Sequence, residues 1–313
     1  MGEKRYAIGV DIGGTTVKLG LFNLEGEALE KWEIPTVKEA QGSHILPDIA
    51  ASIRDKAASR DLALTDVLGV GVGAPGPVDA EGTVHRAVNL GWGVLNIPQA
   101  LQALLELPVK AANDANAAAF GEMWQGGGKG HSNIVAVTLG TGVGGGIIVN
   151  GSILTGATGA GGEIGHLHIV DGETEACGCG NFGCLEQYAS ATGVARLARR
   201  RLDQDQEPSV LRSGELSAKA VWDAVKAGDR VAVQVAEQFG LYLGKGLAAV
   251  AAVANPEVFV IGGGVSKAGE ILFDYIRPAY EKYVFQGCRS AEFALATLGN
   301  DAGIFGAAAL ILN

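Results

Sequence analysis

A strand, a glycine-rich turn and a second strand occur in this order twice in the chain. The first copy is YAIGVDIGGTTVKLGLF, with strands expected at Tyr6–Val10 and Val17–Phe22, and the second is NIVAVTLGTGVGGGIIVNG. When the two are aligned, Asp11 falls on Thr138 and Gly13 falls on Gly140. A repeat of this kind predicts a duplicated fold in which two similar halves are built around similar sheets.

A second pair of similar segments follows further along each half. VLGVGVGAPGPV (67–78) and EVFVIGGGVS (257–266) both end a buried strand in glycines. The chain of 313 residues is long enough for two domains. We therefore expect a duplicated α/β fold with the ligand between the halves. The predicted small domain covers residues 1–116 and 301–313, the larger one covers residues 117–300, and residues 114–118 form the hinge.

Apolar residues at helical spacing predict several helices between the strands. The expected helices are Leu46–Ala58, Ala115–Trp124, Val231–Val253 and Asn181–Arg200, the last broken at Thr192-Gly193. The terminal run AGIFGAAALIL is expected to form an apolar helix that packs back on the first half.

Composition narrows the class of protein. The net charge of −10 argues against a nucleic-acid partner, and no apolar run approaches the length of a membrane span. The N-terminal residues show no apolar signal-peptide core, so we expect a cytoplasmic protein with reduced thiols.

Three of the four cysteines lie together in CGCGNFGCLEQ, at Cys177, Cys179 and Cys184. A disulfide is unusual in a reducing compartment, and the spacing is not Cys-x-x-Cys. Thiolates converging in a glycine-rich turn favour zinc, which needs a fourth ligand. GGEIGHLHIV, just upstream, offers His166 and His168, so the prediction is a Cys₃His zinc site. Cys288 stands alone and is interpreted as a small apolar residue.

The glycine-rich turns predict phosphate binding. Gly140–Gly145 matches G-x-G-x-x-G, but a strand rather than a helix follows, which excludes a dinucleotide-binding fingerprint. Such turns instead present backbone N–H groups to an anion, and two of them can hold one polyphosphate. Asp11 beside such a turn is a candidate Mg²⁺ contact, and the IGGGVS run suits adenosine. The expected ATP and magnesium contacts are Asp11, Gly13, Gly14, Thr15, Thr141, Gly142, Gly263 and Gly264.

Asn113 and Asp114 stand where the apparent strand VKAA meets the alanine-rich helix. A carboxylate at this junction is rigidly held and suits a general base. The same residues also suit the cap of that helix, and one residue can serve both purposes.

Taken in order, DIGGT, GAPGPVD, NDANAAA, LGTGVGGG, ExGH at Glu163–His166 and CGCGNFGCLE resemble the ROK family of sugar kinases over the whole chain. The resemblance is strongest to the bacterial glucokinases of that family. It implies the actin-like, ribonuclease H-like ATPase fold and ATP-dependent phosphorylation of a hexose, most directly glucose at its 6-hydroxyl. It also implies ATP, Mg²⁺ and Zn²⁺ as cofactors and a homodimer or homotetramer.

The resemblance also assigns residues. Asp114 is the implied general base, and His166 rather than His168 is the implied histidine ligand of zinc. The implied zinc ligands are His166, Cys177, Cys179 and Cys184. The implied sugar contacts are Asn89, Asn113, Asp114, Glu163, His166 and Glu186. Zinc on one ring nitrogen of His166 would leave the other for a sugar hydroxyl, so the ion is expected to orient ligands.

Three alternatives stay open. Kinases for N-acetylmannosamine, fructose, mannose or allose would use similar contacts, and polyphosphate is a less favoured donor because no basic track is visible. The family also includes sugar-sensing repressors with a helix-turn-helix segment before DIGGT. Only ten residues precede Asp11 here, and Asp114 is retained, so the enzyme is the expectation.

Overall fold

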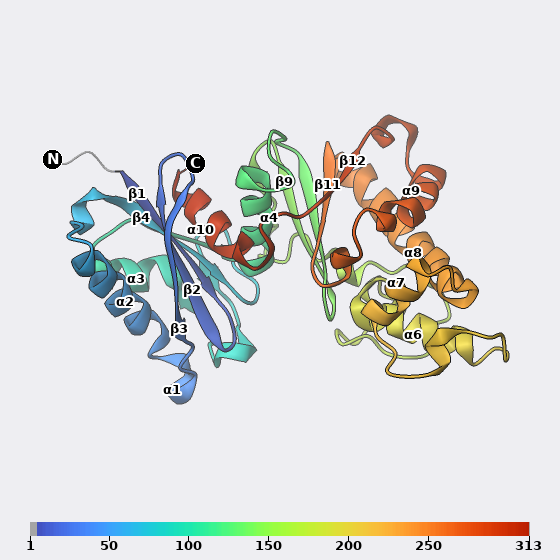
Figure 1. The fold of residues 1–313 in the computed structure, drawn as a ribbon. Helices are drawn as coiled ribbons and strands as arrows, with labels where there is room; N and C mark the ends of the chain where they lie inside the picture. Colours follow the sequence, from blue (N-terminus) through green and yellow to red (C-terminus); the bar gives the residue numbers. More distant parts are fainter. Residues whose placement is uncertain (1–4, 313) are drawn as a thin grey trace.

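The computed structural model describes residues 5–312, which form two similar five-stranded sheets (Figure 1). The first sheet has the order β3-β2-β1-β4-β7, and the second has the order β10-β9-β8-β11-β12. The strands of the first are β1 (Tyr6–Ile12), β2 (Thr16–Asn23), β3 (Ala28–Pro35), β4 (Val67–Ala74) and β7 (Val109–Asn113). Those of the second are β8 (Ile134–Leu139), β9 (Val143–Val149), β10 (Ser152–Ile153), β11 (Val258–Gly262) and β12 (Glu292–Leu295).

The pairing of strands repeats from one sheet to the other. β1 runs antiparallel to β2 and parallel to β4, and β8 runs antiparallel to β9 and parallel to β11. Asp11 lies opposite Gly73 of β4, and Thr138 lies opposite Gly262 of β11. The predicted duplicated α/β fold is confirmed, and Asp11 and Thr138 hold equivalent places in it.

Helices cover the sheets and form the outer part of the second half. They are α1 (Glu39–Gly42), α2 (Ile45–Ser59), α3 (Ile97–Leu105), α4 (Asp114–Gln125), α5 (Glu186–Ala189), α6 (Ala191–Leu202), α7 (Ala218–Lys226), α8 (Arg230–Ala254), α9 (Ile271–Tyr283) and α10 (Ala302–Leu312). Two short strands, β5 (Thr83–Val84) and β6 (Leu95–Asn96), pair with each other. Among the described residues, no helix is both long enough and apolar enough to cross a bilayer.

The prediction for residues 181–200 was partly wrong. Residues 181–185 form no helix, because Phe182 and Cys184 are bridged to Ala176 and His168 in the loop before α5. The break comes at Ser190 rather than at Thr192-Gly193. The Ser190 hydroxyl accepts the N–H of Gly193 and so caps α6.

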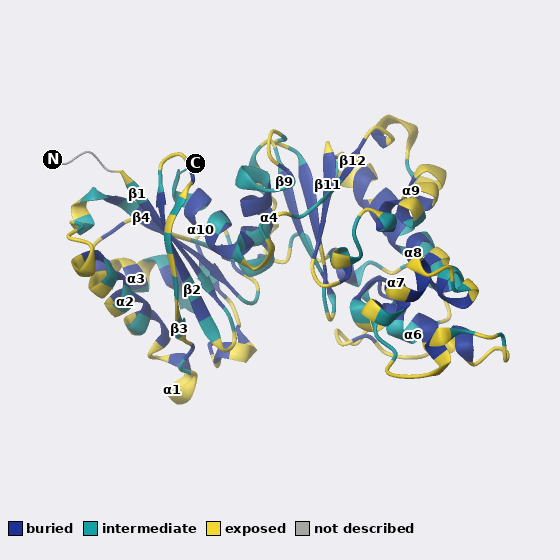
Figure 2. Cartoon of the chain, viewed as in Figure 1, coloured by how far each residue is buried: buried dark blue, intermediate teal, exposed yellow. Residues whose placement is uncertain are grey.

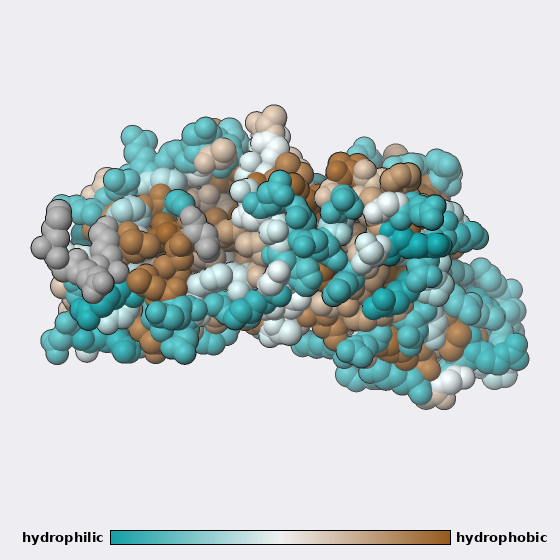
Figure 3. Space-filling model, turned by 90° about the horizontal axis from the view of Figure 1, so that it is seen from above, coloured by the Kyte–Doolittle hydropathy of each residue, from teal (hydrophilic) through white to brown (hydrophobic). Residues whose placement is uncertain are grey.

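Each half has its own hydrophobic core, and exposed residues lie mainly on the outer helices and loops (Figure 2). The first core joins its sheet to α2 and α3, and the second joins its sheet to the helices α5 to α9. Seen from above, hydrophilic side chains cover much of both ends, with apolar patches between them (Figure 3). Two separately packed cores are consistent with two domains.

Helices α4 and α10 lie side by side between the two sheets (Figure 1). Their backbones touch: a Cβ on Gly306 would lie 1.6 Å from the Ala117 carbonyl oxygen, so only glycine fits there. α10 also packs on β1 and β4, which confirms that the terminal helix returns to the first half. The predicted boundary between residues 116 and 117 falls inside α4, and the hinge at 114–118 stays a prediction.

Candidate active site

A cleft of about 960 Å³ lies between the two halves, beside α4. The first half contributes Asp11 and Lys18 to its wall, and the beginning of α4 contributes Asp114. The second half contributes Thr138 and the glycine-rich end of β11. The hollow therefore lies where the duplicated architecture predicts a ligand, at the carboxyl ends of parallel strands.

Asp11 and Asp114 lie close together because their strands are held in one register. Asp11 lies opposite Gly73 of β4, and the next residue of β4, Ala74, lies opposite Asn113. A Cβ on Gly73 would lie 3.7 Å from Asp11 Oδ1 and 3.8 Å from the Asp114 Cα. Gly73 is thus the point at which the two carboxyl-bearing segments meet.

Both carboxyl groups have raised pKa values. Burial, followed by the nearby charge of Asp114, raises the pKa of Asp11 to about 6, while Lys18 acts in the opposite direction. Burial is also the main cause of the raised pKa of Asp114, and the charge of Glu163 adds to it. Carboxyl groups with raised pKa values in a cleft are suited to accept a proton near neutral pH.

Asn113 caps α4 and also fixes Asp114. Its Oδ1 accepts the N–H groups of Ala115 and Asn116, at 3.0 and 3.2 Å. Its Nδ2 donates to the Gly76 carbonyl and to Asp114 Oδ1, both at 3.0 Å. Asp114 Oδ1 also accepts the Ala115 N–H, which leaves Oδ2 with no hydrogen bond to a described residue. The capping and the catalytic interpretations of this pair are therefore compatible.

The cysteine cluster forms as the sequence predicts. Ligand atoms of four residues all lie within 4.8 Å of one another, which is a geometry that can hold a metal ion; they are His166, Cys177, Cys179 and Cys184. Cys177 Sγ lies 3.8 Å from His166 Nδ1, and Cys179 Sγ lies 3.7 Å from Cys184 Sγ.

His168 is bound elsewhere and is not part of the cluster. Its Nδ1 lies 2.8 Å from the Phe182 carbonyl oxygen, and its Nε2 lies 2.9 Å from Asp171. The structure therefore agrees with the choice of His166 as the histidine of the cluster.

Glu186 connects the cysteine cluster to the turn between β8 and β9. Its Oε1 accepts a hydrogen bond of 2.8 Å from Cys177 Sγ and lies 3.7 Å from His166 Nδ1. On its other side, a Cβ on Gly142 would lie 2.6 Å from Glu186 Oε2. Glu186 thus touches both the cluster and the β8–β9 turn.

An ion-pair network around the buried carboxylate of Glu173 fixes the loop that carries the cysteines. Glu173, whose side chain is 3% exposed, accepts two hydrogen bonds from Arg200 and one from the Tyr188 hydroxyl. These donors, Arg200 above all, hold the pKa of Glu173 well below its usual range. The loop is thereby attached to α5 and α6 independently of any metal.

The predicted phosphate-binding residues divide between three places. Gly13, Gly263 and Gly264 line the main cleft, whereas Gly14 and Thr15 are exposed at the tip of the β1–β2 turn. Thr141 and Gly142 line a neighbouring hollow of about 580 Å³ beside α6 instead.

The turn that bears Thr141 and Gly142 is held toward α6 by hydrogen bonds. The Gly140 carbonyl accepts the Ala191 N–H, and the Thr141 carbonyl accepts the Thr192 hydroxyl. Asn89, a predicted sugar contact, is exposed on a 3₁₀ turn at Val88–Leu90.

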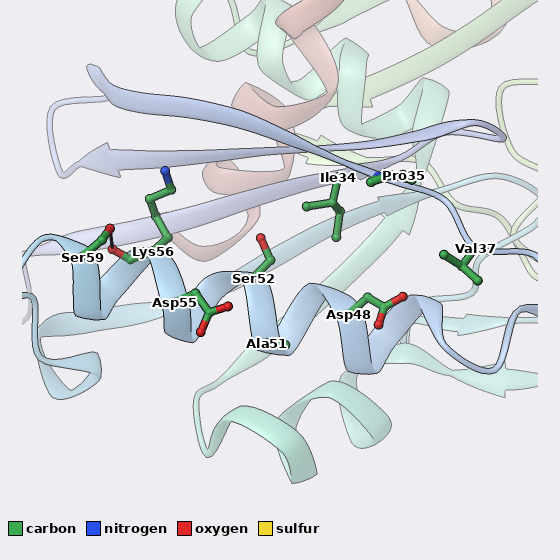
Figure 4. A pocket seen from close by; sticks show the side chains of 9 residues that line it. All are labelled: Ile34, Pro35, Val37, Asp48, Ala51, Ser52, Asp55, Lys56 and Ser59. Carbon is green, nitrogen blue, oxygen red and sulfur yellow. Dashed lines mark hydrogen bonds between the residues drawn. The ribbon is translucent and has the colours of Figure 1, made fainter.

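Another hollow, of about 470 Å³, lies between β3 and α2 on the first half (Figure 4). Its polar residues include Asp48, Asp55 and Lys56, and the Lys56 ammonium is already bound to Glu30 at 2.6 Å. Neither Asp11 nor Asp114 lies in its wall. This hollow brings together no predicted functional residue, so the cleft is the candidate active site.

Sequence reasoning missed several residues of the cleft. Lys18 follows the predicted phosphate-binding turn by two residues, and its Nζ donates to the Asn300 carbonyl at 2.9 Å. Lys267 and Glu122 also line the cleft. Alternation along β2 places Lys18 on the same face as Thr16, and this is the signal that identifies it.

Comparison with known proteins relates the chain to one family of sugar kinases. A family model described as "ROK family" matches residues 7–313. A curated glucokinase of Halalkalibacterium halodurans is 43% identical, and the alignment covers 98% of this chain and 95% of that protein.

Two solved structures are also similar. One is a ROK family glucokinase from Streptomyces griseus in complex with glucose and AMPPNP, with a TM-score of 0.73 and 37% identity, covering 97% of this chain and 98% of that one. The other is a ROK hexokinase from Thermus thermophilus, with a TM-score of 0.79 and 32% identity, covering 97% and 96% of the two chains.

Proposed function

This chain belongs to the ROK family, and we propose that it transfers the γ-phosphoryl group of ATP to the 6-hydroxyl of glucose. The glucokinases among its relatives support this substrate, and one of them was solved with glucose and an ATP analogue. The observation that carries the proposal is Asp114: a carboxyl group of raised pKa at the start of α4, in a cleft lined by both halves.

Asp114 is the proposed general base. Phosphoryl transfer to an alcohol needs a carboxylate that receives the hydroxyl proton while the oxygen attacks phosphorus. Asn113 holds Asp114 Oδ1, so Oδ2 is the oxygen available for that proton. The raised pKa, caused mainly by burial, makes the carboxylate a stronger base than an exposed aspartate.

The nucleotide is proposed to lie along the part of the cleft that Asp11, Lys18 and the end of β11 line. Asp11 supplies a carboxylate for Mg²⁺, and Lys18 supplies a positive charge beside it. Gly263 and Gly264, at the end of β11, leave room for a flat adenosine group against the backbone. Closure of the two halves about residues 114–118 would exclude water, which competes with the sugar for the phosphoryl group.

The cysteine cluster is proposed to hold Zn²⁺, and its residues fit this ion. Three sulfur atoms and one imidazole nitrogen within 4.8 Å are the donor set and compactness of a closed, four-coordinate zinc site. When bound, zinc supplies a fixed positive charge that orients its ligands.

His166 places its Nδ1 in the cluster, and its Nε2 has no hydrogen bond to a described residue. We propose that this nitrogen binds a sugar hydroxyl. Glu186, on the other side of Cys177, and Glu163, near Asp114, offer carboxylates to further hydroxyls.

Release of ADP from Mg·ATP, measured across a panel of hexoses, tests the proposal. The panel contains glucose, mannose, fructose, allose and N-acetylmannosamine, and we expect the highest kcat/KM for glucose. A higher value for another hexose would leave the kinase and replace the substrate. Absence of ADP release with every sugar would contradict the kinase, and polyphosphate as donor and binding to operator DNA would then be examined.

A further inference from the structure

Glu122, in the last turn of α4, is a buried carboxylate with no part in the mechanism described above. Its side chain lines the cleft, although the residue is only 4% exposed. Oε2 accepts the Gly127 N–H at 2.8 Å and the Thr297 N–H at 3.1 Å, and Oε1 accepts the Leu298 N–H at 2.9 Å. One carboxylate therefore binds three backbone N–H groups from two distant parts of the chain.

Those two parts are the places where the chain crosses between the halves. The first crossing is α4, which leads through residues 126–128 into β8. The second is the segment 296–301, which leads from β12 into α10. Close packing supports the contact: a Cβ on Gly127 would lie 2.2 Å from the Leu295 carbonyl oxygen, and one on Gly126 would lie 2.0 Å from Glu122 Oε2.

The second crossing also forms part of the cleft wall. Ala296, Thr297 and Asn300 line it together with the end of β11, where the nucleotide is proposed to bind. The Asn300 carbonyl accepts the hydrogen bond of Lys18. Glu122 itself belongs to α4, the helix that begins at Asp114. Glu122 thus connects the wall of the nucleotide side to the helix that carries the proposed base.

We propose that Glu122 is a positioning residue. It holds the beginning of the second crossing, at Thr297 and Leu298, against α4 and so aligns the nucleotide side of the cleft with Asp114. Its role in catalysis rests on the proposed kinase function, whereas the contact itself does not. Binding of the nucleotide should depend on Glu122 more than binding of the sugar, because the proposed sugar contacts lie elsewhere, around the beginning of α4 and the cysteine cluster.

Hydrogen exchange resolved to single amides tests the contact in the wild-type protein, with or without kinase activity. Thr297 is exposed, and neither it nor Leu298 lies in a helix or strand, so protection of their amides has to come from Glu122. We expect slow exchange at both, and faster exchange in Glu122→Gln. Ala296, whose N–H binds the Ile261 carbonyl, should stay protected in both proteins and is the internal control. Rapid exchange at Thr297 and Leu298 in the wild type would overturn the proposal.

Binding measurements test the consequence for the site. In Glu122→Gln the side-chain amide faces a backbone N–H that it cannot accept, so we expect the Kd of Mg·AMPPNP and the KM of Mg·ATP to rise about tenfold. The Kd of glucose without nucleotide should change less than about twofold. Glu257→Gln is the matched control, because Glu257 accepts the N–H groups of Ser132 and Asn133 within the second half only. Equal losses of nucleotide and glucose affinity, or values equal to those of Glu257→Gln, would show a merely structural role and overturn the proposal.

Discussion

The two halves of the molecule have the same strand order, but their equivalent positions carry different chemistry. Asp11 at the end of β1 is partly buried and has a pKa raised to about 6, whereas Thr138 at the equivalent position of β8 is exposed and uncharged. The first half ends β7 at Asn113, beside Asp114, while the second half carries the cysteine cluster after β10. Duplication therefore supplied a scaffold with a cleft, and the candidate catalytic groups lie where the copies differ.

The largest expected effect comes from the carboxylate at the junction of the two halves. Asp114→Asn should lower kcat by about 10²-fold or more, because the amide cannot receive the hydroxyl proton. Steady-state kinetics with glucose and Mg·ATP measure this loss. Asp48→Asn, the same change on α2 away from the cleft, should leave kcat unchanged. Near-normal turnover of Asp114→Asn would remove Asp114 as the base.

The second prediction concerns Asp11 and stability. A carboxyl group whose pKa rises from 3.8 to about 6 on folding contributes stability that is complete below pH 3.8 and is lost as the pH rises through about 6. At pH 7.5 the free energy of unfolding of Asp11→Asn should therefore be about 1–3 kcal/mol higher than that of the wild type. Near pH 4 the two proteins should have similar free energies of unfolding. Urea unfolding without Mg²⁺ or nucleotide measures both differences.

The equivalent position of the other half supplies the control for this prediction. Thr138→Asp places a carboxylate at an exposed site and should change the free energy of unfolding by less than about 0.5 kcal/mol. A gain in Asp11→Asn that does not depend on pH, or an equally large effect of Thr138→Asp, would contradict the difference between the halves.

The third prediction concerns the cysteine cluster, which only the second half carries. Cys179→Ser should lose bound zinc and weaken glucose binding about tenfold, because His166 and Glu186 lose their fixed orientation. Metal analysis and glucose titration measure these effects. Cys288→Ser is the control, since this buried thiol is not in the cluster. Wild-type protein stripped of zinc that keeps its glucose affinity would show that the cluster does not organise the sugar site.

The smallest effect is expected from replacing a lysine of the cleft, and each half contributes one. Lys18 on β2 and Lys267 after β11 both line the cleft. Replacing either by methionine should raise the KM of Mg·ATP about two- to fivefold, as expected for a partly exposed contact between a cation and phosphate. A difference in kcat would distinguish them further: Lys18 lies beside Asp11, so only Lys18→Met should lower kcat as well.

Much of the fold could be predicted from local patterns. The repeated strand–turn–strand segments identified β1, β2, β8 and β9, and helical spacing identified α2, α4, α8 and α10. Residues 181–185 were wrongly predicted to be helical, because bridges to Ala176 and His168 prevent a helix there and these contacts are not visible in local spacing.

The candidate site was predicted less completely. Motifs identified the cysteine cluster, Asp11 and Asp114, whose side chains the structure brings together in two groups. The turn at Thr141 and Gly142 instead lines the neighbouring hollow, because hydrogen bonds hold it to the beginning of α6. Glu122 was missed because its three donors come from segments that meet only in the folded protein.

We expect the cleft between the two halves to phosphorylate glucose with ATP. ³¹P NMR of the purified protein with glucose and Mg·ATP tests it most directly, since it identifies the phosphorylated product as well as the donor. We expect the γ-phosphate signal of ATP to be replaced by equal amounts of ADP and glucose 6-phosphate. Formation of ADP with inorganic phosphate alone, or phosphate on a different hydroxyl of glucose, would contradict this function.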